Sequence, residues 1–175
     1  HYFDNRKRKK QESFYVHPNS DSAQSTGPLA GVKILDFCSF INGAYSAAIM
    51  GDLGADVIKI EPLTGDLSRA WGPFLNGESR FYQAWNRNKR CITLDLTAQA
   101  GRDIVYDLVR STDVVIENFR AGVTEKLGID YATLRELNPR LIYCSSTAFG
   151  SKGPQRNRPG YDPVLQALSG IIRDN

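Results

Sequence analysis

Two common nucleotide-binding fingerprints are missing from this chain of 175 residues. Neither the GxGxxG pattern of dinucleotide-binding folds nor the GxxxxGK pattern of P-loop proteins occurs. No apolar run approaches the roughly 20 residues that a membrane-spanning helix needs. The first residues also lack the apolar core of a signal peptide. The sequence therefore argues against an NAD-dependent enzyme and a P-loop protein, and it predicts no contact with a membrane.

Cysteine is scarce, with only Cys38, Cys91 and Cys144. Their odd number and the absence of a CxxC spacing predict neither a zinc site nor a disulfide framework, and no metal is expected. All three lie within or beside strand-like runs, where cysteine behaves as a small apolar residue. This usage is typical of a reducing compartment and favours a cytoplasmic location.

Strongly basic character is also missing, although the formal net charge is +3. Residues 1–26 hold five cations and three anions, whereas residues 27–175 hold 17 cations and 16 anions. The folded part is therefore almost neutral, and no nucleic-acid partner is predicted. A hydrophobic content of 41% is typical of a soluble globular domain, and the length suits one such domain.

The chain divides into two parts. Residues 1–26 are polar and show no sustained hydrophobic period, which predicts a disordered lead-in. A mitochondrial transit peptide is a weaker alternative, because such peptides are poor in acids and this segment has three. A nuclear signal at the RKRKK run is a further alternative. Residues 27–175 are predicted to form the folded, α/β part of the chain.

Strand and helix patterns alternate from Gly27 onward. Five apolar, β-branched runs predict strands at 32–37, 57–61, 91–96, 114–118 and 141–146. Helical patterns lie between them at 43–53, 81–85, 97–111 and 131–137, with Thr97 as a predicted N-cap. Such alternation implies βαβ units with right-handed crossovers. The predicted fold class is α/β, a Rossmann-like open parallel sheet with flanking helices.

Four of the strands end in a polar or glycine-bearing block, the position at which parallel sheets place ligands. Residues 36–43 open a helix whose free N–H groups suit a phosphate or a carbonyl oxygen, although an ordinary turn is the alternative. Residues 61–69 predict an exposed loop, either with Asp66 and Arg69 available to polar ligands or merely solvated. Residues 86–90 hold three cations that suit an anionic ligand, with a solvated face as the alternative.

The block at 117–122 ends a strand in Asn118, which can hydrogen-bond an adenine or amide edge. The neighbouring Phe119 can stack on a flat ring, or it is simply a core residue. A last block at 158–163 enters a helix, with Asp162 as the predicted N-cap and Pro163 at the first helical position.

Five segments in this order resemble the class III CoA-transferases, which include formyl-CoA transferase, carnitine CoA-transferase and 2-methylacyl-CoA racemase. The segments are GVKILDF (31–37), DVIKIEP (56–62), NRNKRCITLDL (86–96), DVVIENFRAG (113–122) and RPGYDPVLQALSG (158–170). The resemblance covers about residues 28–173. It implies the first part of the family's large domain, and CoA or acyl-CoA as a substrate without a permanently bound cofactor. It also implies a carboxylic acid as second substrate and an interlocked homodimer.

The resemblance assigns CoA contacts to ten residues, and it leaves the catalytic residue of this chain unknown. The ten are Ile41, Asn42, Leu94, Thr97, Asn118, Phe119, Arg120, Lys126, Arg158 and Tyr161. Formyl-CoA transferase has a basic residue where this chain has Pro62, so one phosphate contact departs from the pattern. Racemases carry a catalytic His where this chain has Tyr161. That difference favours a transferase, because Tyr is a poor base at neutral pH.

Family chemistry implies a nucleophilic aspartate that forms an aspartyl-CoA thioester. In the family this residue follows the ALSG helix at a greater distance than Asp174 does. The resemblance therefore predicts that residues 1–175 alone hold much of the CoA groove but do not catalyse transfer. A racemase-type isomerase and a non-catalytic CoA-binding remnant stay open as alternatives.

Overall fold

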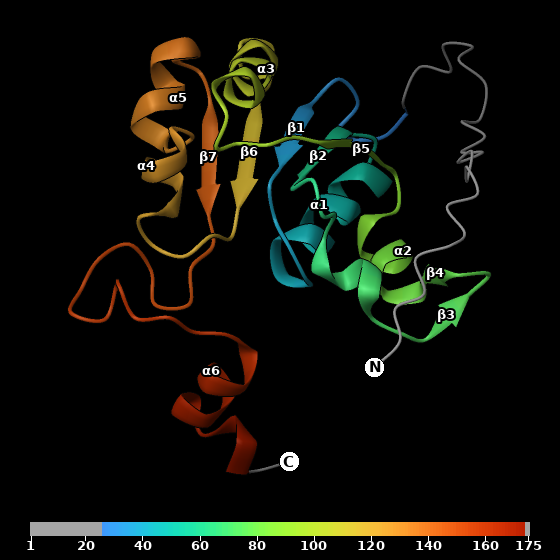
Figure 1. Ribbon diagram of the computed structural model, residues 1–175, viewed down its shortest axis with the longest axis vertical. Coiled ribbons are helices and arrows are strands. Elements are labelled where there is room, and N and C mark those ends of the chain that lie inside the picture. The colour runs from blue at the N-terminus through green and yellow to red at the C-terminus, as the bar shows by residue number, and fades with distance from the viewer. Residues whose placement is uncertain (1–25, 174–175) are drawn as a thin grey trace, which may run out of the picture.

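The computed structural model describes residues 26–173, so the lead-in predicted for residues 1–26 falls almost wholly outside the described residues. Five parallel strands form one sheet in the order β5-β2-β1-β6-β7. Their bounds are β1 Lys33–Asp36, β2 Asp56–Glu61, β5 Lys89–Thr93, β6 Val114–Glu117 and β7 Ile142–Ser145. The predicted Rossmann-like open parallel sheet is confirmed (Figure 1).

The remaining elements flank the sheet or precede its strands. The helices are α1 Asn42–Asp52, α2 Arg80–Asn86, α3 Gln99–Val109, α4 Val123–Leu127, α5 Tyr131–Leu137 and α6 Asp162–Ser169. Two 3-10 turns, η1 and η2, span Leu67–Ala70 and Ile171–Arg173. A two-stranded hairpin, β3 Phe74–Leu75 and β4 Glu78–Ser79, adds a feature that the sequence patterns did not predict.

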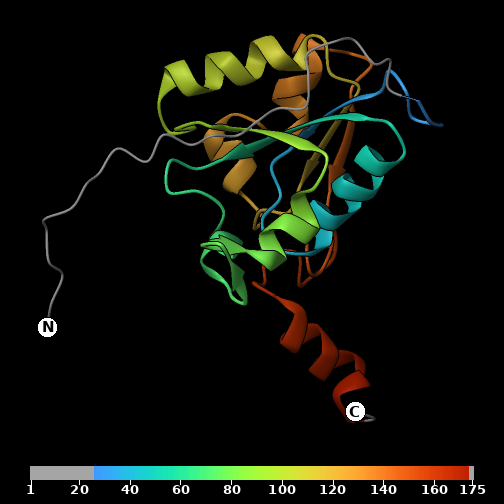
Figure 2. The same ribbon diagram turned by 90° about the vertical axis from the view of Figure 1, so that its right-hand side faces the viewer.

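Strand order reverses between β1 and β6, because the chain crosses from β5 at one edge of the sheet back to the centre. The crossing segment is α3, which lies on the opposite face of the sheet from α1 (Figures 1 and 2). Loops that leave neighbouring strands in opposite directions open a crevice at such a switch point. A ligand crevice is therefore expected at the carboxyl ends of β1 and β6.

Each face of the sheet has its own core. On the α1 face, small helix residues pack against alternate strand residues, as Ala44 and Ala47 do against Ile34 and Val57. On the α3 and α5 face, a larger cluster includes Leu35, Val105, Val115, Leu134 and Leu141. The alternation follows from the period of two along each strand.

The start of α1 lies very close to the end of β1. A Cβ atom at Gly43 would come within 2.1 Å of the Cys38 Sγ atom, so only glycine fits at this point of the helix. The sequence predicted a small-residue helix here, and the close approach is the reason for it. It brings the first turn of α1 to the edge of the switch point.

Two predicted N-caps are wrong. Helix α3 begins after Ala98, whose side chain caps nothing, and Thr97 belongs to a tight turn in which its N–H and its hydroxyl donate to Asp95 Oδ1. Helix α6 is preceded by Tyr161, so Asp162 is its first residue and accepts a hydrogen bond from Gln166 Nε2. In both cases the helix starts one residue away from the position expected from the residue type.

Helix α5 has the side-chain cap that these two helices lack. Asp130 accepts hydrogen bonds from the Thr133 backbone N–H at 3.1 Å and from the Thr133 hydroxyl at 2.7 Å. Replacing Asp130 with Ala should lower the free energy of unfolding by about 1 kcal/mol, measured by urea unfolding. Asp162→Ala serves as the control, with an expected loss of only a few tenths of a kcal/mol. Equal losses in the two variants would contradict this account.

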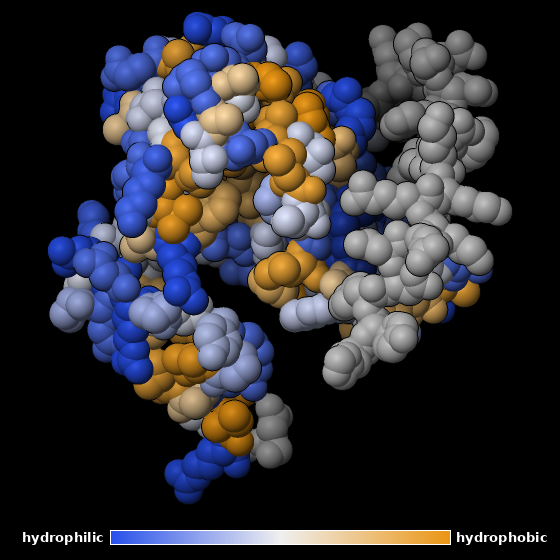
Figure 3. Space-filling view, viewed as in Figure 1, coloured by the Kyte–Doolittle hydropathy of each residue, from blue (hydrophilic) through white to orange (hydrophobic). Residues whose placement is uncertain are grey.

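Apolar side chains remain at the surface of the described residues. They include Ile142 on the edge strand β7, Tyr45 and Ile49 on α1, and Leu168 on α6. Figure 3 shows apolar colour on the C-terminal helical segment and across the middle of the same side. Within residues 26–173, no helix is long and apolar enough to cross a membrane.

Candidate functional site

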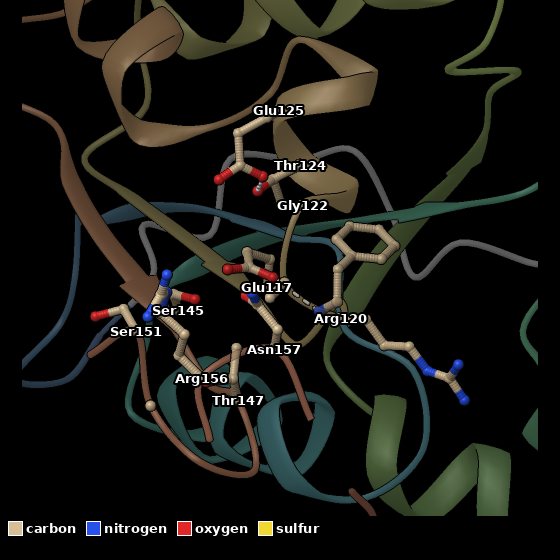
Figure 4. A pocket seen from close by; sticks show the side chains of 13 residues that line it. Glu117, Arg120, Gly122, Thr124, Glu125, Ser145, Thr147, Ser151, Arg156 and Asn157 are labelled. Atoms are coloured by element: carbon tan, nitrogen blue, oxygen red, sulfur yellow. Dashed lines mark hydrogen bonds between the residues drawn. The ribbon is translucent and has the colours of Figure 1, made fainter. Parts of the chain in front are cut away.

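A pocket of about 320 Å³ lies where β6 and β7 end (Figure 4). Residues from β6 and α4 line one side, and residues from β7 and the following loop line the other. They are Glu117, Phe119, Arg120, Ala121, Gly122, Thr124, Glu125, Ser145, Thr147, Gly150, Ser151, Arg156 and Asn157. The pocket thus adjoins the switch point on the carboxyl edge of the sheet.

Both signs of charge line this pocket. Glu117 is buried, and its Oε2 atom accepts a hydrogen bond from the Phe119 N–H at 2.7 Å. Arg120 is exposed, and in Figure 4 its guanidinium group points away from the Glu117 carboxylate, whereas Arg156 comes from the loop after β7. The guanidinium groups suit phosphate oxygens, and the carboxylate and hydroxyls suit ligand donors.

Side chains join the loops on the two sides of the switch point. The Asn118 amide donates to the Ser39 carbonyl at 2.8 Å and accepts from the Ser39 N–H at 3.0 Å. The Asn42 amide donates to the Ser146 hydroxyl at 2.7 Å. The crevice therefore has fixed walls, and Asn118 already uses its amide to hold one of them.

A buried ionic network lies beneath the loop between β1 and α1. Lys59 pairs with Asp66 at 3.0 Å, and the exposed fraction of each side chain is 1%. Lys89 pairs with Asp36 at 2.7 Å, and both side chains have an exposed fraction of 0%. Burial lowers the pKa of Lys89, and the Asp36 carboxylate counters part of this effect. We call Asp36, Lys59, Asp66 and Lys89 the buried lysine network.

The network corrects one prediction and one interpretation. Asp66 was expected on an exposed loop, but it points inward because Lys59 reaches it from β2. The cations at residues 86–90 were interpreted either as partners of an anionic ligand or as a solvated face. Instead Arg87 pairs with Asp52, Arg90 with Asp56 and Lys89 with Asp36, so the chain's own carboxylates neutralise them.

Glu61 ends β2, the place where dinucleotide-binding folds use an acidic residue to bind a ribose. Here the Glu61 carboxylate accepts hydrogen bonds from Arg69, from the Tyr82 hydroxyl and from the Asp66 N–H. Burial alone raises the pKa of Glu61, but these hydrogen bonds outweigh it and lower the pKa to about 2. Arg69, expected to face a ligand, is therefore used to hold Glu61.

The cysteines differ from one another, contrary to the sequence interpretation. Cys38 is buried, and burial raises the pKa of its thiol. Cys91 and Cys144 are exposed, and the Cys91 sulfur lies 3.2 Å from the Tyr82 hydroxyl. Only Cys38 behaves as a small core residue. Among residues 26–173, no group of His, Cys, Asp and Glu side chains could hold a metal ion.

Comparison with known proteins decides the family. The sequence matches the model of CoA-transferase family III over residues 29–173. The chain belongs to this family. Among its curated relatives is the acetyl-CoA:oxalate CoA-transferase of Acetobacter aceti, 43% identical over 151 residues, which are 86% of this chain and 39% of that protein. The human succinyl-CoA:glutarate CoA-transferase is 41% identical over 157 residues, which are 89% of this chain and 36% of that protein.

A solved structure agrees. A CAIB/BAIF family protein from Brucella suis superposes with a TM-score of 0.80 at 44% sequence identity, covering 83% of this chain and 40% of that one. The chain thus spans about two fifths of the length of the relatives it matches.

The ten residues that the resemblance to CoA-transferase family III singled out fall into two sets of five, one at the pocket or the adjoining switch point and one apart from them. Phe119 and Arg120 line the pocket, and Phe119 also packs against the larger core cluster, so both of its interpretations apply. Ile41 and Asn42 stand at the start of α1 across the crevice, joined to Asn118 through the loop after β1.

The other five residues lie apart from the pocket lining. Leu94 has an exposed fraction of 7% and belongs to the core, so its side chain presents little surface to a ligand, while Thr97 is exposed beyond β5. Lys126 is exposed on α4. Arg158 and Tyr161 are exposed in the segment before α6, where the Arg158 guanidinium lies over the Phe149 ring at 5.5 Å. Their contacts with CoA stay predictions.

Sequence reasoning missed several residues of the pocket. Ser145 ends β7 and Thr147 lies just after it, and a carboxyl strand end was the signal that could have found them. Glu117 stood inside a recognised block but received no role. Arg156 and Asn157 come from an irregular segment without any pattern, and only the fold brings them to the pocket.

Proposed function

We propose that the protein moves CoA between an acyl-CoA thioester and a free carboxylic acid, as an interlocked homodimer, and that residues 26–173 supply much of its CoA groove. The observation that carries this proposal is the pocket at the carboxyl edge of the sheet, next to the switch point, in a chain of CoA-transferase family III. Arg120 and Arg156 offer two guanidinium groups at its rim, which suit the phosphates of CoA.

The proposed chemistry is covalent. An aspartate carboxylate attacks the thioester carbonyl and expels the CoA thiolate, giving a mixed anhydride. The thiolate then attacks the aspartyl carbonyl of that anhydride, which forms aspartyl-CoA and releases the first acid. A second carboxylate runs the same steps in reverse, and the exchange is thereby split into easier steps. We place this aspartate outside residues 1–175, as the family resemblance implies.

The start of α1 supports a role in stabilising the oxyanions of these steps. Its N-cap residue, Ile41, makes no side-chain cap, so the first-turn N–H groups receive no side-chain acceptor from it. Such N–H groups carry the positive end of the helix dipole toward the crevice. Backbone N–H groups near Ile41 and Asn42 are therefore the proposed donors.

Turnover by the full-length protein tests the proposal. The relatives' names pair acetyl-CoA with oxalate and succinyl-CoA with glutarate, so these two donors and two acids form the first panel. The expected result is a new acyl-CoA thioester, separated by liquid chromatography, with residues 1–175 alone giving none. Exchange of the α-proton of a branched acyl-CoA in deuterated buffer without any new thioester would support an isomerase instead.

Arg120 gives a prediction about binding. Arg120→Gln should raise the dissociation constant for CoA about fivefold, roughly 1 kcal/mol, because one charge-assisted contact with a phosphate is lost at an exposed site. The loss should shrink as salt is added. Titration calorimetry measures it. Arg140→Gln is the matched control. Arg140 is also exposed, but it lies just before β7, at the amino ends of the strands and away from the pocket at their carboxyl ends. An equal effect of both variants would rule out a local contact.

A further inference from the structure

The loop between β1 and α1, residues 37–41, holds a strained backbone. Phe40 has a φ of 62°, a left-handed conformation that a bulky residue rarely adopts. Its ring lies 5.0 Å from the Trp71 ring, which follows η1. Strain of this kind persists only where surrounding contacts determine the conformation, and it gathers at sites that need a fixed geometry.

Contacts from β2 and β5 hold this loop from beneath. The Lys59 ammonium donates to the Cys38 carbonyl and pairs with Asp66 at 3.0 Å. The Lys89 ammonium pairs with Asp36 and donates to the Ala44 carbonyl at 2.6 Å. One lysine therefore fixes the residue before the strained turn, and the other fixes the first turn of α1 after it.

Contacts from Asp36, at the end of β1, and from Asn118, just after β6, hold the same loop from its other side. Asp36 Oδ1 accepts the Cys38 N–H at 2.8 Å, and Asn118 exchanges two hydrogen bonds with the Ser39 backbone. The backbone polar groups of Cys38 and Ser39 are thus all engaged by side chains. A loop with this many anchors is fixed in advance of any ligand.

We propose that Lys59 and Asp66 are positioning residues for CoA binding, acting through the Cys38 carbonyl on the loop that presents Ile41 and Asn42. This inference rests on the proposed function. If Lys59 and Asp66 served stability alone, Lys59 would need no hydrogen bond to a loop carbonyl, because Asp66 already neutralises the charge of Lys59. Taking two charges out of water is also expensive, and a pair of apolar residues would serve a core better. The bond from Lys59 to the Cys38 carbonyl explains why the lysine is there.

The test replaces both members of the pair in the full-length protein. Lys59→Met combined with Asp66→Asn leaves no unpaired buried charge, and the Asn oxygen can still accept from the Ser68 N–H. The expected result is a rise of about tenfold in KM for acyl-CoA, the usual effect of losing one hydrogen bond to a charged group. KM for the carboxylic acid should stay within about twofold. Arg90→Gln is the control, since it breaks an exposed pair on the same sheet and should change neither value.

The pattern of change separates positioning from stability. A purely structural role lowers the fraction of active enzyme, so kcat falls while both KM values hold, and that result would overturn the inference. A wild-type protein that neither binds CoA nor transfers it refutes the proposed function instead. If the double variant does not fold, Lys59→Arg keeps the charge but moves the donor, and an unchanged KM for acyl-CoA would equally overturn the inference.

Hydrogen exchange on the wild-type protein gives a measurement that needs no variant. The Cys38 and Ser39 amides should exchange slowly before CoA is added, because both already donate to side chains. A loop that exchanges fast and becomes protected only with CoA present would contradict a loop held in place by Lys59 and Asp66.

Discussion

Replacing Lys89 with Met should lower the free energy of unfolding by about 3–5 kcal/mol. The change leaves the Asp36 carboxylate, with an exposed fraction of 0%, without its cation in the interior. It also removes the donors to the Ala44 carbonyl and the Asn86 side-chain oxygen. Urea unfolding followed by circular dichroism measures the loss.

The adjacent residue on the same strand is the control. Arg90 pairs with Asp56, but these side chains have exposed fractions of 60% and 45%, so Arg90→Met should cost less than about 1 kcal/mol. Adding Asp36→Asn to Lys89→Met should recover part of the loss, because no uncompensated charge then remains. If the two single variants were equally stable, Lys89 would not be stabilising the interior as described.

Much of the fold could be predicted from hydrophobic period alone. The runs that became β1, β2, β6, β7 and α2 were recognised with errors of at most one residue at each end, and α5 was recognised with its exact bounds. The 3.6-residue stripe of α3 was also recognised, but its start was not, because the residue type at Thr97 suggested a cap that the chain forms elsewhere. The hydrophobic period reflects which side of a helix or strand is buried, whereas an N-cap depends on the conformation of the turn before the helix.

The buried charges could not be predicted, for a physical reason. Along β2, Val57, Lys59 and Glu61 share one face, and a strand with charges on alternate positions is usually half exposed to water. Here α1 covers that face, Asp66 just before η1 neutralises Lys59, and Arg69 in η1 pairs with Glu61. A run of cations such as residues 86–90 is interpreted as solvated or ligand-binding until its partners are known. Those partners lie more than 30 residues away.

The candidate site, like the fold, could be predicted only in part. Strand ends at Asn118 and Phe119 were predicted because parallel strands deliver their carboxyl ends to one edge. The structure adds that the Asn118 amide is hydrogen-bonded to the Ser39 backbone, so Asn118 shapes the crevice as well as facing it. Arg156 reaches the pocket only because the segment after β7 folds back, and no local pattern encodes that return.

Glu61 should make the stability of this fold depend on acid. Its pKa is lowered from 4.5 to about 2 in the folded protein, so folding favours the charged form. The contribution is fully present above pH 4.5, and it is lost as the pH falls through the folded pKa near 2. A shift of this size corresponds to roughly 3 kcal/mol. Glu61→Gln should therefore be less stable than the wild type by about that amount at pH 7.

The difference in free energy of unfolding between wild type and Glu61→Gln should shrink as the pH falls from 4.5 toward 2. At low pH the wild-type carboxylate becomes protonated and neutral, as the Gln side chain is at every pH. Urea unfolding at pH 7, 5, 3.5 and 2.5 follows this convergence. Glu136→Gln is the matched control, because Glu136 is an exposed residue on α5. This variant should have the same free energy of unfolding as the wild type at each of these pH values. A constant gap between wild type and Glu61→Gln down to pH 2.5 would mean that shape and hydrogen bonding, rather than the charge of Glu61, stabilise the end of β2.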